Sequence, residues 1–238
     1  MSRRPRILLY SNRMIISLTG FMGCGKSSVG KVLSARLGCP FTDLDAAIVE
    51  RIGCTIPAFF ARHGEADFRT LESVVLSDVL AASLAGQPLT GHSLPGHPPS
   101  PLTPGNEGIC RSGRGGVSGG TAPAISAVLA LGGGTVMTPD CAHMIQERTC
   151  CIYLRATVDT LVQRLRNEAA GRPMLRTRTP DPGTEPCPTP ADADIALRER
   201  ISSLLAQRSA IYESVAHHII DVDGLSVEDV ARSILSTI

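Results

Sequence analysis

The sequence predicts an α/β protein built on a five-stranded parallel sheet that helices cover on both faces. Three observations lead to this prediction. Strand-like runs alternate with helix-like segments, a glycine-rich loop stands between the first strand and the first helix, and residues 124–131 (AISAVLAL) are apolar throughout. Such alternation gives parallel strands joined by helical crossovers, and a strand without a polar side has both of its faces buried.

Length and composition set the broad class. The 238 residues are enough for one sizeable core, so a single domain with insertions is the simplest organisation. A formal net charge of +1 and 3% aromatic residues argue against a nucleic-acid partner. No apolar run reaches the roughly 18 residues of a membrane span. We therefore expect a cytoplasmic protein without nucleic-acid or membrane partners, and a monomer.

The eight cysteines form no C-x-x-C pair, so we expect reduced thiols rather than disulfides or a zinc site. Residues 1–13 form a basic leader with four arginines, whose apolar segment is too short for a signal peptide. We expect the leader to be flexible, and either Met1 or Met14 could be the start of the protein.

The first strand, residues 14–19, leads into residues 20–27, which read GFMGCGKS. This run fits G-x-x-x-x-G-K-[ST], the phosphate-binding P-loop. A helix ending at Gly38 follows, so the motif has the strand and helix that it requires. Backbone N–H groups at the helix start would face phosphate, Lys26 would reach the β- and γ-phosphates, and Ser27 would bind Mg²⁺. The alternative is a glycine-rich turn that matches by chance.

The remaining elements follow in order. We expect a short strand at 40–44, helices at 46–52 and 55–64, a longer helix at 65–84, the strand at 124–131, a helix from Pro139, a strand at 149–154, a helix capped by Thr157, a long helix at 192–216, a strand at 218–221 and a terminal helix capped by Ser226.

Two stretches lack a usable period. Residues 87–121 are rich in Gly, Pro, Ser and His, and we interpret them as an insertion. Residues 167–190 carry six prolines and Arg172. A mobile loop with an arginine beside an ATP site is typical of a lid. The alternative for Arg172 is a charge in a disordered loop.

Ligands of open parallel sheets bind at the carboxyl ends of the strands. Asp43 and Asp45 follow the second strand, and Gly132, Gly133 and Gly134 follow the third. Two carboxylates next to a P-loop suit phosphoryl transfer to an alcohol, because one can serve Mg²⁺ and the other can orient or deprotonate the hydroxyl. The alternative for Asp45 is an N-cap of the following helix.

Two arginines on helices are candidates for the substrate. Arg69 and Arg208 would suit a carboxylate if both face the crevice, although an arginine on a helix often lies on a solvated surface. Glu72, one turn beyond Arg69, could hold it in place, and the alternative is an ordinary surface charge. The three glycines would give a small ligand a backbone surface without side chains, or simply form a flexible turn.

Six ordered segments together resemble shikimate kinase. They are residues 20–27, 41–45 (FTDLD), 64–72 (GEADFRTLE), 131–135 (LGGGT), 171–175 (GRPML) and 207–212 (QRSAIY). The resemblance covers most of residues 14–86 and 125–224. The insertion and an unusually long, proline-rich lid depart from the family's pattern and leave lid behaviour and oligomeric state open.

The resemblance implies a P-loop NTPase-like three-layer sandwich with substrate-binding helices and a lid, and an ATP-dependent kinase acting on the shikimate 3-hydroxyl, on the route to chorismate and the aromatic amino acids. It assigns ATP phosphates to Gly23, Cys24, Gly25, Lys26, Ser27, Ser28 and the lid residue Arg172. It assigns shikimate to Asp45, Arg69, Gly132, Gly133, Gly134 and Arg208. It assigns the binding of Mg²⁺ to Ser27 and, through water, to Asp43. Lys26, Asp45 and Arg172 are the catalytic candidates, with Asp45 as the base.

Two other functions compete. A related small-molecule kinase, such as a gluconate kinase, would also use an arginine pair for a carboxylate. A non-catalytic nucleotide-binding regulator would keep the fold alone, which the intact Lys26, Ser27, Asp43 and Asp45 argue against.

Overall fold

The computed structural model describes residues 13–86, 124–166 and 190–238, with the backbone alone for residues 190–193. The elements are β1 (Arg13–Thr19), α1 (Lys26–Leu37), β2 (Phe41–Asp43), α2 (Leu44–Ile52), α3 (Ile56–Ala85), β3 (Ala124–Ala130), the 3₁₀ turn η1 (Thr135–Met137), α4 (Pro139–Arg148), β4 (Thr149–Arg155), α5 (Val158–Leu165), α6 (Pro190–Val215), β5 (His218–Asp221) and α7 (Val227–Thr237). The predicted leader lies outside this part of the chain except for Arg13, as do the insertion at 87–121 and lid residues 167–189.

The five strands form one parallel sheet in the order β2-β3-β1-β4-β5, which confirms the predicted fold class. β1 lies at the centre and pairs with β3 on one side and β4 on the other. The P-loop that follows β1 therefore emerges from the middle of the sheet. The loops after β3 and β4 flank it, because parallel strands end at the same edge.

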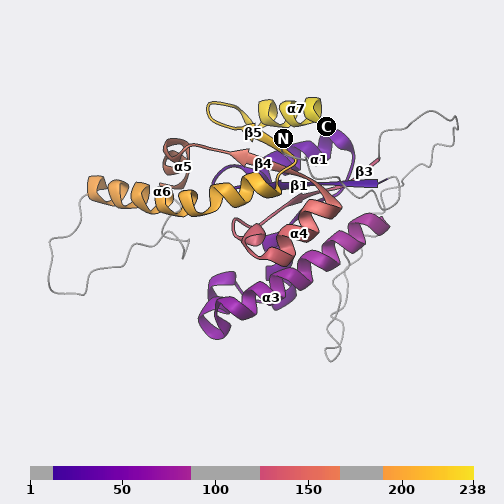
Figure 1. The fold of residues 1–238 in the computed structure, drawn as a ribbon, viewed down its shortest axis with the longest axis horizontal. Helices are drawn as coiled ribbons and strands as arrows, with labels where there is room; N and C mark the ends of the chain where they lie inside the picture. The colour runs from indigo at the N-terminus through magenta and orange to yellow at the C-terminus, as the bar shows by residue number, and fades with distance from the viewer. Residues whose placement is uncertain (1–12, 87–123, 167–189) are drawn as a thin grey trace, which may run out of the picture.

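Helices cover both faces of the sheet. Figure 1 shows α1 and α7 on one side, and α3 and α4 on the other. Consecutive residues of β1 supply both cores: Ile16 packs in the cluster with α1 and α7, and Ile15 in the cluster with α3 and α4. Neither isoleucine is exposed to solvent. Successive strand side chains point to opposite faces, so a strand covered on both sides needs apolar residues throughout.

The predicted helix boundaries hold closely. Thr55, Thr157 and Ser226 cap α3, α5 and α7 with their side chains. The predicted break between residues 64 and 65 is a kink inside α3, where Gly64 has φ 80° and ψ −178°. This left-handed φ favours glycine, so the two predicted helices form one bent rod. Among the described residues, no helix is both long and apolar enough to cross a membrane.

Candidate active site

The P-loop begins directly after β1. Gly20 has φ 139°, and a Cβ there would come within 2.6 Å of the carbonyl oxygen of Leu154 on β4, so only glycine fits. The Lys26 ammonium donates to the carbonyl oxygens of Gly20 at 2.9 Å and Phe21 at 3.0 Å, so it lies across the loop. Gly25 precedes α1 without a side-chain cap, which leaves the first N–H groups of the helix for an anion.

One part of the P-loop packs in the core, and the part at the start of α1 is exposed to solvent. Cys24 is buried, 1% exposed, and packs in the core, so its side chain fixes the loop while its backbone lines it. Ser27 and Ser28 are exposed at the start of α1. A Cβ on Gly23 would come within 2.8 Å of Leu165, which brings α5 directly against the loop.

Ser27 and Asp43 join the P-loop to the end of β2. The Ser27 hydroxyl donates to one oxygen of Asp43 at 2.5 Å. The other Asp43 oxygen accepts from the backbone N–H groups of Asp45 at 3.1 Å and Ala46 at 3.4 Å. A hydroxyl and a carboxylate that meet in this way are oxygen ligands of the type that Mg²⁺ takes beside a phosphate.

Asp45 does not cap α2, so that alternative is wrong. Asp43 holds the cap position, with an extended backbone (φ −100°, ψ 119°) and its carboxylate over the first turn. Asp45 is in the first turn itself and is exposed. One of its oxygens lies 2.6 Å from where a Cβ of Gly132 would be. The structure therefore brings Asp45 against the glycine loop after β3, as the rule for strand ends predicts.

Arg69 lies on the same side of the crevice. Its guanidinium is 2.9 Å from where a Cβ of Gly134 would be. It donates to Glu72 at 2.7 Å and to Glu65 at 3.2 Å. Burial acts to lower the pKa of Arg69, but the hydrogen bond and charge of Glu72, followed by those of Glu65, outweigh it and raise the pKa.

Glu72 anchors this arginine from the core. It is 1% exposed and also accepts from the hydroxyl of Thr135 at 2.7 Å. Two partners satisfy a carboxylate that would be costly to bury alone. The prediction that Glu72 holds Arg69 in place fits these contacts.

Arg208 approaches from α6 and is 8% exposed, so it does not belong to a solvated helix face. It precedes Tyr212 by one turn of α6. The Tyr212 hydroxyl donates to the carbonyl oxygen of Gly133. The part of α6 that carries Arg208 is therefore tied to the glycine loop, which also lies against Asp45 and Arg69.

The sequence analysis did not single out Arg164. Its guanidinium donates to the carbonyl oxygens of Gly23 at 3.4 Å and Cys24 at 3.2 Å, so it lies against the P-loop. No sequence pattern marks this contact, which depends on the strand order: α5 follows β4, and β4 lies beside β1. Arg172 lies outside the described residues, and its role in a lid stays a prediction.

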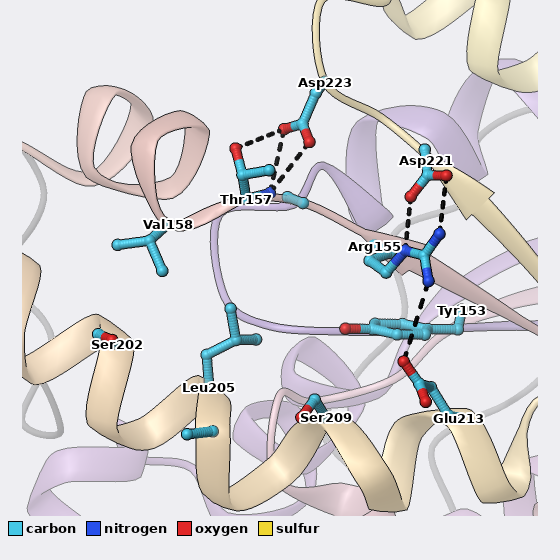
Figure 2. Close-up of a pocket in the computed structure, with 12 residues that line it drawn as sticks. Tyr153, Arg155, Thr157, Val158, Ser202, Leu205, Ser209, Glu213, Asp221 and Asp223 are labelled. Carbon is cyan, nitrogen blue, oxygen red and sulfur yellow. Dashed lines mark hydrogen bonds and ion pairs between the residues drawn. The ribbon is translucent and has the colours of Figure 1, made fainter.

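A cavity of about 370 Å³ opens at the other end of this edge, between β4, β5 and α6. Figure 2 shows Asp221 and Glu213 on either side of Arg155, and Asp223 against Thr157. Arg155 donates to Asp221 at 2.6 Å and lowers the pKa of that carboxyl. Asp223 accepts from the backbone N–H of Thr157 at 3.1 Å. These contacts tie the loop after β5 to the loop after β4, and the predicted adenine contact near 221–224 stays a prediction.

The fold and the site define a P-loop kinase, with a phosphate loop at the centre of the sheet edge and the polar side chains of Asp45 and Arg69 gathered at the neighbouring glycine loop. The family model for shikimate kinase matches residues 22–86 and 121–238. The chain belongs to the shikimate kinase family.

The individual relatives agree with this family. The shikimate kinase of Salinibacter ruber is 34% identical, over 94% of this chain and 84% of the relative. That of Geobacter metallireducens is 33% identical, over 92% and 88%. Among solved structures, the shikimate kinase of Acinetobacter baumannii in complex with shikimate has a TM-score of 0.65 at 26% identity, over 94% of this chain and 92% of that one. The enzyme of Bacteroides thetaiotaomicron has a TM-score of 0.64 at 25% identity, over 94% and 97%.

Proposed function

We propose that this chain transfers the γ-phosphoryl group of ATP to the 3-hydroxyl of shikimate, giving shikimate 3-phosphate and ADP on the route to chorismate. The observation that carries the proposal is the meeting of Asp45, Arg69 and the glycine loop in one crevice beside the P-loop. A carboxylate and an arginine at that place match an acid that also carries hydroxyl groups.

On the nucleotide side, the backbone of Gly23, Cys24, Gly25, Ser27 and Ser28 would hold the phosphates together with Lys26. The ammonium of Lys26 would exchange its two carbonyl contacts for phosphate oxygens, which are stronger acceptors. Arg172 would join from the lid. Ser27 and, through water, Asp43 would hold Mg²⁺, which offsets the negative charge of the phosphates when bound.

On the acceptor side, Arg69 and Arg208 would bind the carboxylate of shikimate. The backbone of Gly132, Gly133 and Gly134 would lie along its ring without intervening side chains. Asp45 would accept the proton of the attacking hydroxyl, because its exposed carboxylate faces the same crevice. We also propose that the protein is a monomer and works in the cytoplasm. Its only partners would be the two small molecules ATP and shikimate.

The test is ADP formation by the purified chain with MgATP and shikimate, gluconate or no acceptor. We expect ADP only with shikimate. A preparation of Lys26→Ala made in the same host serves as the control, since any activity that remains belongs to a contaminating kinase. ADP formed with gluconate would assign the site to a related kinase, and no acceptor-dependent ADP would favour a nucleotide-binding regulator.

A further inference from the structure

Tyr212 contacts three elements around the proposed shikimate site. It is fully buried on α6. Its hydroxyl donates to the carbonyl oxygen of Gly133, in the loop after β3. Its ring stacks on Tyr153 of β4, with 5.1 Å between the ring centroids and 29° between the planes. One side chain thus connects a helix, a loop and a strand that are far apart in the sequence.

Two of these elements, the loop after β3 and α6, carry residues that the proposed function assigns to shikimate binding. Gly133 is the middle residue of the glycine loop, and Arg208 precedes Tyr212 by one turn of α6. The hydrogen bond from Tyr212 to Gly133 therefore joins the loop that would support the ring to the part of α6 that carries the arginine for the carboxylate.

Burial keeps this hydroxyl a donor. It raises the pKa of Tyr212, and the nearby charge of Arg208 offsets only part of that rise. The hydroxyl stays protonated over the pH range in which a cytoplasmic enzyme works, so its bond to Gly133 persists throughout.

We propose, resting on the function proposed above, that Tyr212 is a positioning residue: its hydroxyl sets the spacing between the glycine loop and Arg208, and thereby the affinity for shikimate. Tyr212 does not need to touch the substrate for this role. Tyr212 fixes the glycine loop and the part of α6 with Arg208 before shikimate binds, so binding does not have to order these two elements.

Tyr153 supplies a matched control. It belongs to the same ring stack and is 1% exposed. Its hydroxyl points instead into the cavity between β4, β5 and α6, to the side where Leu205 lies (Figure 2), and it donates no hydrogen bond to any described residue. Tyr212→Phe and Tyr153→Phe each remove one buried hydroxyl from the stack, but only the first breaks a link to the crevice.

The experiment compares both variants with the wild-type chain in steady-state assays, varying shikimate and ATP in turn. We expect Tyr212→Phe to raise the KM for shikimate about tenfold, the factor that one hydrogen bond of about 1.4 kcal/mol supplies. We expect the KM for ATP and kcat to change less than about twofold, because contacts present before and during the reaction affect binding alone. Tyr153→Phe should behave as wild type.

Shikimate alone gives a second readout. We expect it to raise the Tm of the wild type and of Tyr153→Phe, and to raise the Tm of Tyr212→Phe much less at the same concentration.

Three results would overturn the proposal. They are an unchanged KM for shikimate in Tyr212→Phe, parallel increases for both substrates or in both variants, and failure of Tyr212→Phe to fold while Tyr153→Phe folds. A wild-type chain that neither uses nor binds shikimate would refute the proposed function itself, and with it this role, which distinguishes the two failures.

Discussion

A single methyl group at Gly132 should disable the acceptor site. The backbone there accepts alanine, because Gly132 is not among the glycines with positive φ. The new Cβ would stand 2.6 Å from an Asp45 oxygen and 2.9 Å from the Thr135 hydroxyl. Ordinary van der Waals contact begins at 3.4 Å, so the Asp45 oxygen has to move away from the new Cβ by about 0.8 Å. The exposed carboxylate of Asp45 moves aside, and the Thr135 hydroxyl has to shift as well, although it is buried and bonded to Glu72.

A shift of about 1 Å at a reacting group lowers a rate by about 10²-fold, or about 2.7 kcal/mol in the activation free energy. We therefore expect Gly132→Ala to reduce kcat about 10²-fold with saturating shikimate. The KM for ATP should stay within about twofold, since the P-loop is not displaced. The Tm should fall modestly, because the Asp45 carboxylate is exposed but the Thr135 hydroxyl is buried.

Coupled ADP assays and thermal unfolding check these expectations together. A kcat within about threefold of wild type, in a variant with wild-type Tm, would refute the assignment of Asp45 and Gly132 to one site. A large loss of ATP affinity would contradict it as well, because the methyl group would then act through the P-loop.

Three further predictions follow from other contacts. Asp45→Asn should lower kcat by about 10²-fold or more while ATP still binds, and near-normal turnover would contradict its role as base. Glu72→Ala should cost about 3 kcal/mol in urea unfolding, because it leaves the half-buried Arg69 with the exposed Glu65 alone and the buried Thr135 hydroxyl without its acceptor, and a loss under about 1 kcal/mol would contradict the role of Glu72 as their anchor. Burial, and then the charge of His218, lower the pKa of His217, so stability is full above the ordinary value of about 6.5 and falls as the pH drops through the lowered pKa. The free energy of unfolding should differ less between pH 7.5 and pH 5.5 in His217→Gln than in wild type. Equal differences in the two proteins would contradict the assignment of the pH effect to His217.

The structural reason for the histidine effect is a bond that only neutral His217 can make. Its Nδ1 accepts from the backbone N–H of Cys151 at 3.0 Å, and the backbone N–H of His217 donates to the carbonyl oxygen of Cys151 at 2.8 Å. Protonation fills the Nδ1 lone pair and breaks the first of these bonds. The expected loss at low pH is therefore a loosening at the start of β5.

The sequence was sufficient for features that depend on neighbours in the chain. The P-loop, the glycine loop that follows β3 and the break at Gly64 all follow from residue types and their spacing. The rule that parallel strands end at one edge then brought Asp45 to the glycine loop without knowledge of the strand order.

The remaining features depend on contacts that cross the fold. Arg164 and Tyr212 bond to backbone carbonyls, which every residue possesses, so no sequence pattern marks their partners. The alternative in which Asp45 caps α2 fails for a related reason. The strand ends one residue earlier than expected, at Asp43, and this one-residue difference decides which carboxylate caps the helix and which faces the crevice.

The central claim is that this crevice directs the γ-phosphoryl group of ATP to one hydroxyl of shikimate, and the identity of the product tests it most directly. Phosphorus NMR of a completed reaction with equal amounts of MgATP and shikimate distinguishes the possible products. We expect ADP and an equal amount of a single phosphate ester coupled to the proton at carbon 3 of shikimate. Free phosphate in place of the ester, or an ester on another hydroxyl, would contradict the account.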